Sequence, residues 1–237
     1  MNYQWDWHIL VTQPYASWLL SGLRLTLVTS LASWAIAVLA GSVIGVAMCW
    51  PNRLVRATAA VYVEIFRNVP PLAQLFLWYF VLPEVVPNAV GLWIKRDLPA
   101  PEVVTACVAI GCFAAARMAV QVRAGILAVS AQLLPACLAT GLRYAQSFRL
   151  VLLPLALRSI VGPLTSEFLI IVKMSSISLT IGVLEITAQS RHIENFTFHG
   201  LEAYSAATLV YLVIGLGVTA VMRVVDRRFS LASLAAH

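Results

Sequence analysis

One run of the chain excludes most soluble folds: no charged side chain occurs between Arg24 and Arg53. About 20 consecutive apolar residues suffice to cross the hydrocarbon core of a bilayer as a helix. The run therefore predicts a transmembrane helix over residues 25–50 that ends before Pro51. Residues 203–222 form a second charge-free run. Since 61% of the chain is hydrophobic and 11% is charged, against about 25% charged in soluble domains, the sequence predicts an all-α integral membrane protein.

Three further apolar segments complete a predicted set of about five transmembrane helices. They cover residues 57–82, 103–127 and 150–172. Unlike the first two runs, they contain charged side chains, namely Glu64, Arg67, Arg117, Arg123, Arg158 and Glu167. Ionisable side chains are costly in hydrocarbon, so they generally face a bundle interior or a water-filled path. Little of the chain remains for an independent extramembrane domain.

The segments that connect the spans differ in charge between the two sides of the membrane. One side carries nine arginines and one acidic residue, on the loops at 51–57 and 123–158 and after Met222. The other side carries three basic and seven acidic residues, on the N-terminal segment and the loops at 83–102 and 174–202. Because cytoplasmic loops are enriched in Lys and Arg, the arginine-rich side is predicted to be cytoplasmic. An odd number of spans then places the N-terminus outside and the C-terminus in the cytoplasm.

Several common chemistries lack their motifs in this sequence. There is no GxxxxGK[ST] phosphate loop, no HExxH zinc motif and no GxSxG nucleophile elbow. The four cysteines form no CxxC pair, which argues against a zinc site. We therefore predict no enzyme activity, no metal and no cofactor. The net charge of +6 indicates contact with membrane lipid rather than with nucleic acid.

The longest predicted cytoplasmic loop covers residues 128–149 and keeps several apolar side chains. Pro135 favours the first turn of a short helix. Gly141 favours the end of that helix, because glycine readily adopts the left-handed conformation. Arg143 is then predicted to begin a second helix that enters the membrane. From periodicity alone, the short helix is more typical of an interfacial helix that lies on lipid.

The residues of this loop resemble a known signature. Residues 135–154 read P-A-C-x3-G-x9-V-x-L-P, which is similar to the E-A-A-x3-G-x9-I-x-L-P signature of ABC-importer permeases. Residues 62–80 resemble the second-span motif of that family, and residues 154–189 resemble the pattern that follows the loop in polar-amino-acid permeases. The motifs occur in the family's order over nearly the whole chain, and they resemble the glutamate/aspartate subgroup most.

This resemblance implies a permease that moves a polar amino acid, most simply glutamate or aspartate, across the bacterial inner membrane by alternating access. The implied partners are ABC ATPase subunits, a second permease subunit, which the departures in the loop suggest is a paralogue, and an extracytoplasmic solute-binding protein. The permease domain would cover residues 22–228, between a periplasmic N-terminal segment (1–21) and a cytoplasmic tail (229–237). Two alternatives stay open: a permease for another polar amino acid, and a self-contained secondary carrier or channel.

In this family the short cytoplasmic helix docks into a groove of the ATPase. Carried over position by position, the resemblance assigns ATPase coupling to Ala136, Gly141, Leu142, Arg143 and Pro154. The chain departs from the signature at Pro135, which replaces the glutamate, and at Cys137, which replaces the second alanine. Without that glutamate, docking is expected to depend on shape, apolar contact and Arg143.

Arg117 lies in the middle of a predicted span, at a position where the family more often has an aromatic residue. Its guanidinium offers a bidentate fork for a carboxylate. We therefore place Arg117, together with Glu167, on the substrate pathway of an acidic amino acid. The alternative is a structural ion pair of Arg117 with Glu167 or with Glu64.

Two further groups of polar residues lie in or next to predicted spans. Lys173, Ser175 and Ser176 lie where the fourth span breaks into a serine-rich segment. Broken helices expose backbone groups to a cavity, so these residues are also candidates for the pathway. The alternative for the lysine is that it extends to the membrane interface. Glu64 and Arg67 are three residues apart on one helical face and are expected to form a structural pair.

Overall fold

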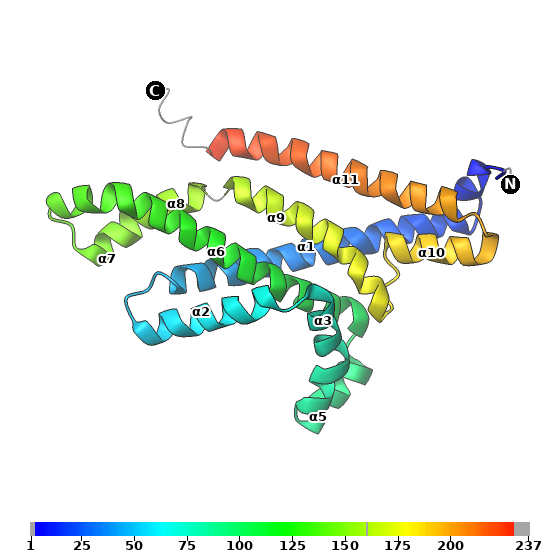
Figure 1. Ribbon diagram of the computed structural model, residues 1–237, viewed down its shortest axis with the longest axis horizontal. Coiled ribbons are helices and arrows are strands. Elements are labelled where there is room, and N and C mark those ends of the chain that lie inside the picture. Colours follow the sequence, from blue (N-terminus) through cyan, green and yellow to red (C-terminus); the bar gives the residue numbers. More distant parts are fainter. Residues whose placement is uncertain (1–2, 160, 230–237) are drawn as a thin grey trace. The chain divides into compact units, whose positions relative to one another are not determined.

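The computed structural model describes the backbone of residues 3–159 and 161–229 and the side chains of residues 3–156 and 163–224. Every regular element in this part of the chain is a helix (Figure 1), as the composition predicts. In chain order, the elements are η1 (Trp7–Val11), α1 (Tyr15–Ala47), α2 (Arg53–Asn68), α3 (Pro71–Phe76), η2 (Leu77–Val81), α4 (Leu82–Val85), α5 (Asn88–Leu92), η3 (Trp93–Asp97), α6 (Pro101–Ala139), α7 (Tyr144–Ser147), η4 (Phe148–Leu152), α8 (Leu153–Ser159), α9 (Val161–Met174), η5 (Ser175–Ile181), α10 (Ile186–Thr197) and α11 (Gly200–Phe229).

Four segments of the described residues are long and apolar enough to cross a membrane, which confirms a multi-pass helical protein. They are Tyr15–Ala47, Pro101–Ala139, Pro163–Ile181 and Gly200–Val224. A fifth apolar segment, Pro71–Val85, is shorter. The prediction of one continuous span over residues 57–82 is wrong, because the chain breaks between α2 and α3. Proline restricts the residue before it to extended conformations, and Val69, followed by Pro70, has φ −88° and ψ 131°.

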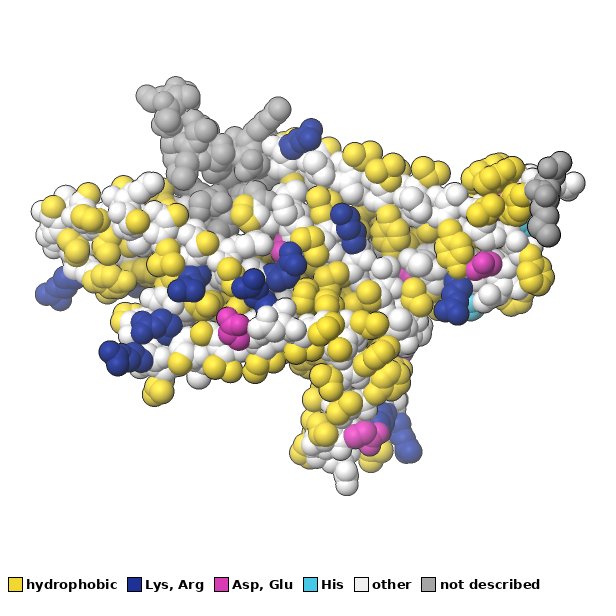
Figure 2. Space-filling view, in the orientation of Figure 1, with side chains coloured by type: hydrophobic (Ala, Val, Ile, Leu, Met, Phe, Trp, Pro, Cys, Tyr) yellow, Lys and Arg dark blue, Asp and Glu magenta, His cyan; other side chains and the backbone are white. Residues whose placement is uncertain are grey.

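Apolar side chains cover long stretches of the helices on the face shown in Figure 2. On α11, for example, Leu212, Val213 and Leu216 are all more than half exposed. A continuous exposed apolar surface is rare on soluble monomers. Such a surface is the one expected where lipid, rather than water, surrounds the helix.

The chain divides into two compact units, each built from three separate segments. The first unit comprises Met1–Ser33, Pro70–Ile110 and Leu169–Gly217. Its apolar core contains Leu75, Ala106, Ala109, Ile181 and Val183. Buried hydroxyls of α1 also connect its segments: Thr26 Oγ1 accepts a hydrogen bond from the Ile186 N–H at 3.1 Å, and Ser33 Oγ donates to the Cys107 carbonyl at 3.2 Å.

The second unit comprises Trp34–Val69, Gly111–Phe168 and Val218–His237. In it, α1 and α6 approach each other closely at two glycines one turn apart. A Cβ atom on Gly41 would lie 2.6 Å from the Met118 Cβ, and one on Gly45 would lie 2.6 Å from the Val122 Cβ. Small residues at this spacing let helix backbones pack tightly inside a membrane. The glycines therefore hold α1 against the part of α6 that carries the charged cluster described next.

Candidate functional site

The second unit contains a charged cluster inside its apolar helices. Arg117 and Gln121 lie one turn apart on α6, and Glu167 lies on α9. Arg117 Nε donates to Glu167 Oε1 at 2.8 Å, and Gln121 Nε2 donates to Glu167 Oε2 at 3.1 Å. The Glu167 side chain is 1% exposed, whereas that of Arg117 is 35% exposed. Of the two carboxylates considered for Arg117, the partner is Glu167 and not Glu64.

This cluster leaves hydrogen-bonding groups unused. Both oxygens of Glu167 are satisfied, as a buried carboxylate requires, because a desolvated charge is costly without partners. Arg117 makes this contact through Nε alone, and its two Nη groups have no hydrogen-bond partner within the described part of the chain. Gln121 Oε1 is buried and also lacks a partner there. The two Nη groups of Arg117 could therefore receive a carboxylate, and Gln121 Oε1 could receive an ammonium group. Both side chains stay bonded to Glu167 meanwhile.

The predicted break after the fourth span is confirmed in the first unit. α9 ends at Met174, and the chain continues as the 3-10 helix η5. Ser175 Oγ donates to the Val172 carbonyl and Ser176 Oγ donates to the Lys173 carbonyl, both at 2.8 Å. Ser175 is buried, whereas Lys173 is exposed. Both hydroxyl protons are thus used by the preceding turn. Because Ser175 is fully buried, the groups that stay accessible to a ligand are the Lys173 ammonium and the Ser176 hydroxyl oxygen.

The expected ion pair between Glu64 and Arg67 is not among the ion pairs of the described residues. Both side chains are exposed on α2. Glu64 Oε2 instead accepts a hydrogen bond from Asn68 Nδ2 at 3.0 Å. On a helix surface the neighbour four residues ahead is within reach, as is the one three ahead, and here the carboxylate turns toward the amide.

The prediction that Pro135 begins a separate short helix is wrong. α6 continues through Pro135 to Ala139 as one helix of 39 residues. An interior proline removes one backbone hydrogen bond and crowds the preceding turn. It is accommodated here close to the helix end, where the neighbouring residues Leu134 and Ala136 are strong helix formers.

Gly141 ends α6 in the left-handed conformation, as the sequence predicts, with φ +87°. The Leu142 N–H donates to the Cys137 carbonyl at 3.2 Å, and the Gly141 N–H donates to the Leu138 carbonyl at 3.0 Å. These two bonds form a Schellman cap. The predicted second helix is also present, since Arg143 directly precedes α7.

The residues expected to couple to an ATPase lie at or after this turn. Ala136, Gly141 and Arg143 are exposed, and Leu142 is half-buried. Pro154 is exposed as well, but it lies in α8, beyond α7 and η4. The first four residues therefore lie close together along the chain at the end of α6, three of them exposed, and Pro154 lies apart from them along the chain.

A buried carboxylate that the sequence reasoning missed lies in the first unit. Glu185 is fully buried and caps α10: Oε2 accepts from the Thr187 N–H at 3.0 Å, and Oε1 accepts from the Ala188 N–H at 2.8 Å. Tyr211 Oη donates to Oε2 at 2.7 Å. Burial raises the pKa of the Glu185 carboxyl, and these hydrogen bonds oppose the rise. A sequence signal existed, because an acidic residue directly before a helical run is typical of an N-cap.

A second network in the first unit ties the N-terminal segment to the start of α11. Glu202 is fully buried and accepts hydrogen bonds from the Tyr3 hydroxyl and, at 2.8 Å, from the Asp6 N–H. His199 Nδ1 lies 3.2 Å from the same carboxylate. The hydrogen bond to Glu202 raises the pKa of Tyr3 to about 12. Two residues of the predicted periplasmic segment (1–21), Tyr3 and Asp6, are therefore hydrogen-bonded to α11.

Among the residues with described side chains, no group of three or more histidine, cysteine and carboxylate side chains could hold a metal ion. The predicted tail, residues 229–237, lies outside the described residues apart from the backbone of Phe229.

Known proteins resemble this chain over nearly its whole length. The family described as "Binding-protein-dependent transport system inner membrane component" matches residues 18–231. The glutamate/aspartate import permease protein GltJ of Escherichia coli K12 is 38% identical over 240 residues, which cover 98% of this chain and 97% of that protein. The glutamine transport system permease protein GlnP of the same organism is 30% identical over 228 residues, 96% of this chain and 99% of that protein. A crystal structure of an amino acid ABC transporter with histidines superposes with a TM-score of 0.82 at 27% identity, covering 95% of this chain and 100% of that one.

Proposed function

Since the chain belongs to the family of binding-protein-dependent transport system inner membrane components, we propose that it is the permease subunit of an ABC importer for glutamate and aspartate. The relative that carries this substrate in its name is 38% identical, whereas the glutamine permease is 30% identical. The partners are ATPase subunits, a paralogous second permease subunit and an extracytoplasmic solute-binding protein. The permease domain, residues 22–228, contributes the path, and the ATPases contribute the hydrolysis of ATP.

Alternating access explains how such a subunit works without chemistry of its own. ATP binding draws the ATPases together, and the exposed surface of Ala136, Gly141, Leu142 and Arg143 transmits that movement to α6. The helices then shift between inward-facing and outward-facing states that bind substrate with different affinity. The charge distribution of the loops supports a cytoplasmic position for this surface and an outer position for the N-terminus.

The substrate class rests on one observation, the unused fork of Arg117. Its Nε is bonded to Glu167, so the guanidinium is held in one orientation while both Nη groups stay available. An acidic amino acid brings a carboxylate that matches this fork and an ammonium group that matches an acceptor such as Gln121 Oε1. A charged solute crosses hydrocarbon only where such groups replace its water. Lys173, Ser175 and Ser176 are proposed as further groups along the path.

The test is uptake of labelled aspartate by proteoliposomes that contain the chain with its permease partner and ATPase. We expect uptake to require ATP and the ATPase. Gly141→Val should abolish it, because a β-branched residue cannot easily adopt φ +87° and the turn at the end of α6 would be distorted.

Gly182→Val is the matched control. Like Gly141, Gly182 has a positive φ (+96°), and a Cβ atom at this position would have no neighbouring heavy atom within 4 Å. It strains the backbone equally but leaves the α6 turn intact. Accumulation of aspartate by the chain alone would favour a self-contained carrier. Equal ATP-driven uptake by the Gly141→Val variant and the unaltered protein would contradict the coupling role.

A further inference from the structure

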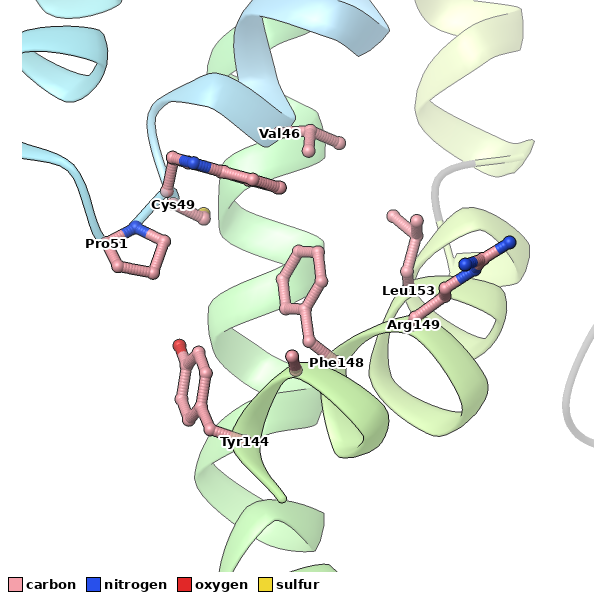
Figure 3. A pocket seen from close by; sticks show the side chains of 9 residues that line it. Val46, Cys49, Pro51, Tyr144, Phe148, Arg149 and Leu153 are labelled. Atoms are coloured by element: carbon pink, nitrogen blue, oxygen red, sulfur yellow. The ribbon is translucent and has the colours of Figure 1, made fainter. Parts of the chain in front are cut away.

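A pocket of about 420 Å³ opens at the end of α1 in the second unit. Its walls come from the last turn of α1 and from α7, η4 and α8 (Figure 3). Val46, Phe148 and Leu153 supply apolar wall, and Tyr144 adds an aromatic ring. The volume lies within the range of small-molecule sites in proteins. The pocket offers almost no hydrogen-bonding groups from these walls, which makes it unsuited to an amino acid.

The pocket lies at the level where a membrane span meets water. α1 ends at Ala47, directly after Val46, and Trp50 lines the pocket three residues further on. Trp and Tyr side chains favour the headgroup region because each combines an apolar ring with a polar group. Trp50 and Tyr144 therefore place the mouth of the pocket at the boundary between hydrocarbon and headgroups.

The charged side chain among the lining residues of this pocket is a cation. Arg149 lines it, is exposed, and forms no ion pair within the described residues. No acidic residue lines the pocket. The stem of Arg149 lines the pocket and its guanidinium extends outward from it (Figure 3). An apolar interior with a cation beside it complements a molecule with a hydrocarbon tail and a negative head.

We propose that this pocket binds an anionic phospholipid of the adjacent leaflet, with one acyl chain inside and the phosphate on Arg149. Basic pockets between membrane helices are known physical sites for acidic headgroups. The chain enters because burying methylene groups against Val46, Phe148 and Leu153 is favourable. The bound lipid fills the space between the end of α1 and the segment after Gly141.

Cys49 reports the occupancy of the pocket, because its side chain lines it. In a variant with Cys107, Cys112 and Cys137 replaced by Ala, the rate of maleimide alkylation of Cys49 is measured in nanodiscs. Discs of phosphatidylcholine alone are compared with discs that contain phosphatidylglycerol. We expect alkylation to be about fivefold slower with phosphatidylglycerol, as one cationic contact at a membrane surface allows.

Arg149→Gln should remove the difference between the two kinds of disc. Arg56→Gln is the matched control, since Arg56 is an exposed arginine of the same unit that does not line the pocket. It should retain the difference. Native mass spectrometry of the three proteins, released from the same discs, should show a retained phosphatidylglycerol on all but the Arg149→Gln variant.

Equal alkylation rates in the two kinds of disc would overturn the proposal, and so would slowing that survives Arg149→Gln. Protection of Cys49 that appears only after ATPase subunits are added would assign the pocket to the ATPase and also overturn it. None of these measurements requires transport, so their failure is distinct from a failure of the proposed import function.

Discussion

Two buried carboxylates, Glu167 in the second unit and Glu185 in the first, are satisfied by different kinds of partner. Glu185 receives two backbone N–H groups from the helix that it caps and a hydroxyl from Tyr211. Glu167 receives a cation and an amide from another helix, α6. The first arrangement uses local donors and stabilises a helix end. The second orients two side chains that still have free hydrogen-bonding groups, and only this arrangement is suited to receive a ligand.

The largest expected effect comes from Arg117→Leu, which removes the cation from Glu167 and removes the fork. Hydrogen bonds between the charged fork and a substrate carboxylate are worth about 2 kcal/mol, or about 30-fold. The unpaired Glu167 carboxylate should separately lower membrane abundance. Uptake of labelled aspartate, divided by the amount of inserted protein, should fall by that factor.

The double variant Arg117→Leu with Glu167→Leu separates the two roles of the arginine. Without the carboxylate no buried charge is left unpaired, so membrane abundance should return. Uptake should stay low, because the fork is still absent. Recovery of uptake would show that Arg117 acts only as a structural partner, and the substrate contact would be wrong.

Glu185→Ala should produce a loss of stability without a change in substrate affinity. It removes the cap of α10 and leaves the Tyr211 hydroxyl without its acceptor, at a cost of about 2 kcal/mol. Thermal unfolding of the purified complex measures the loss, and the KM for aspartate should be unchanged. Glu185→Gln keeps one acceptor oxygen and should lose less. A raised KM in either variant would place Glu185 on the substrate path and remove the contrast with Glu167.

In contrast to Glu185→Ala, Gln121→Leu should change the affinity for aspartate slightly and leave stability unchanged. Glu167 keeps Arg117, while the unpaired Gln121 Oε1 is lost together with one hydrogen bond worth about 1 kcal/mol, or about fivefold in KM. The KM for aspartate is measured alongside membrane abundance, which should not change. An unchanged KM would restrict the binding groups to Arg117.

The smallest effect concerns Tyr3, whose hydrogen bond to Glu202 raises its pKa from 10.0 to about 12. The folded state therefore keeps this proton more firmly than the unfolded chain. The resulting stabilisation is present below pH 10 and is lost as the pH rises through 12. The difference in phenolate absorbance between the unaltered protein and Tyr3→Phe should titrate near pH 12. A titration at the ordinary tyrosine value would mean that the N-terminal segment is not held by α11.

The sequence predicts best where one physical requirement dominates. The absence of charge after Arg24 requires burial in hydrocarbon, and α1 follows to within a few residues of the expected end. The left-handed turn at Gly141 follows from the conformational freedom of glycine. For Arg117 the sequence predicts two possible ion-pair partners, because a charge inside a span needs a partner but periodicity cannot choose which one.

The sequence predicts least where long-range packing decides between acceptable local structures. Proline favours the first turn of a helix, yet Pro135 lies in the interior of α6. The role of Glu185 depends on Tyr211, which lies 26 residues away in sequence and on a different helix. The orphaned oxygen of Gln121 is visible only once α6 and α9 lie side by side, since nothing in its sequence neighbourhood distinguishes it from a solvated glutamine.

The uninterrupted length of α6 has a mechanical consequence. Arg117 and Ala139 belong to the same helix, and at 1.5 Å per residue they are about 33 Å apart along its axis. The helix is continuous over this length, including Pro135, so a displacement at one end is expected to move the other. A displacement at the Ala139 end would tilt the helix and move the Arg117 guanidinium. Binding and release of substrate at Arg117 would then coincide with the movement of the ATPases.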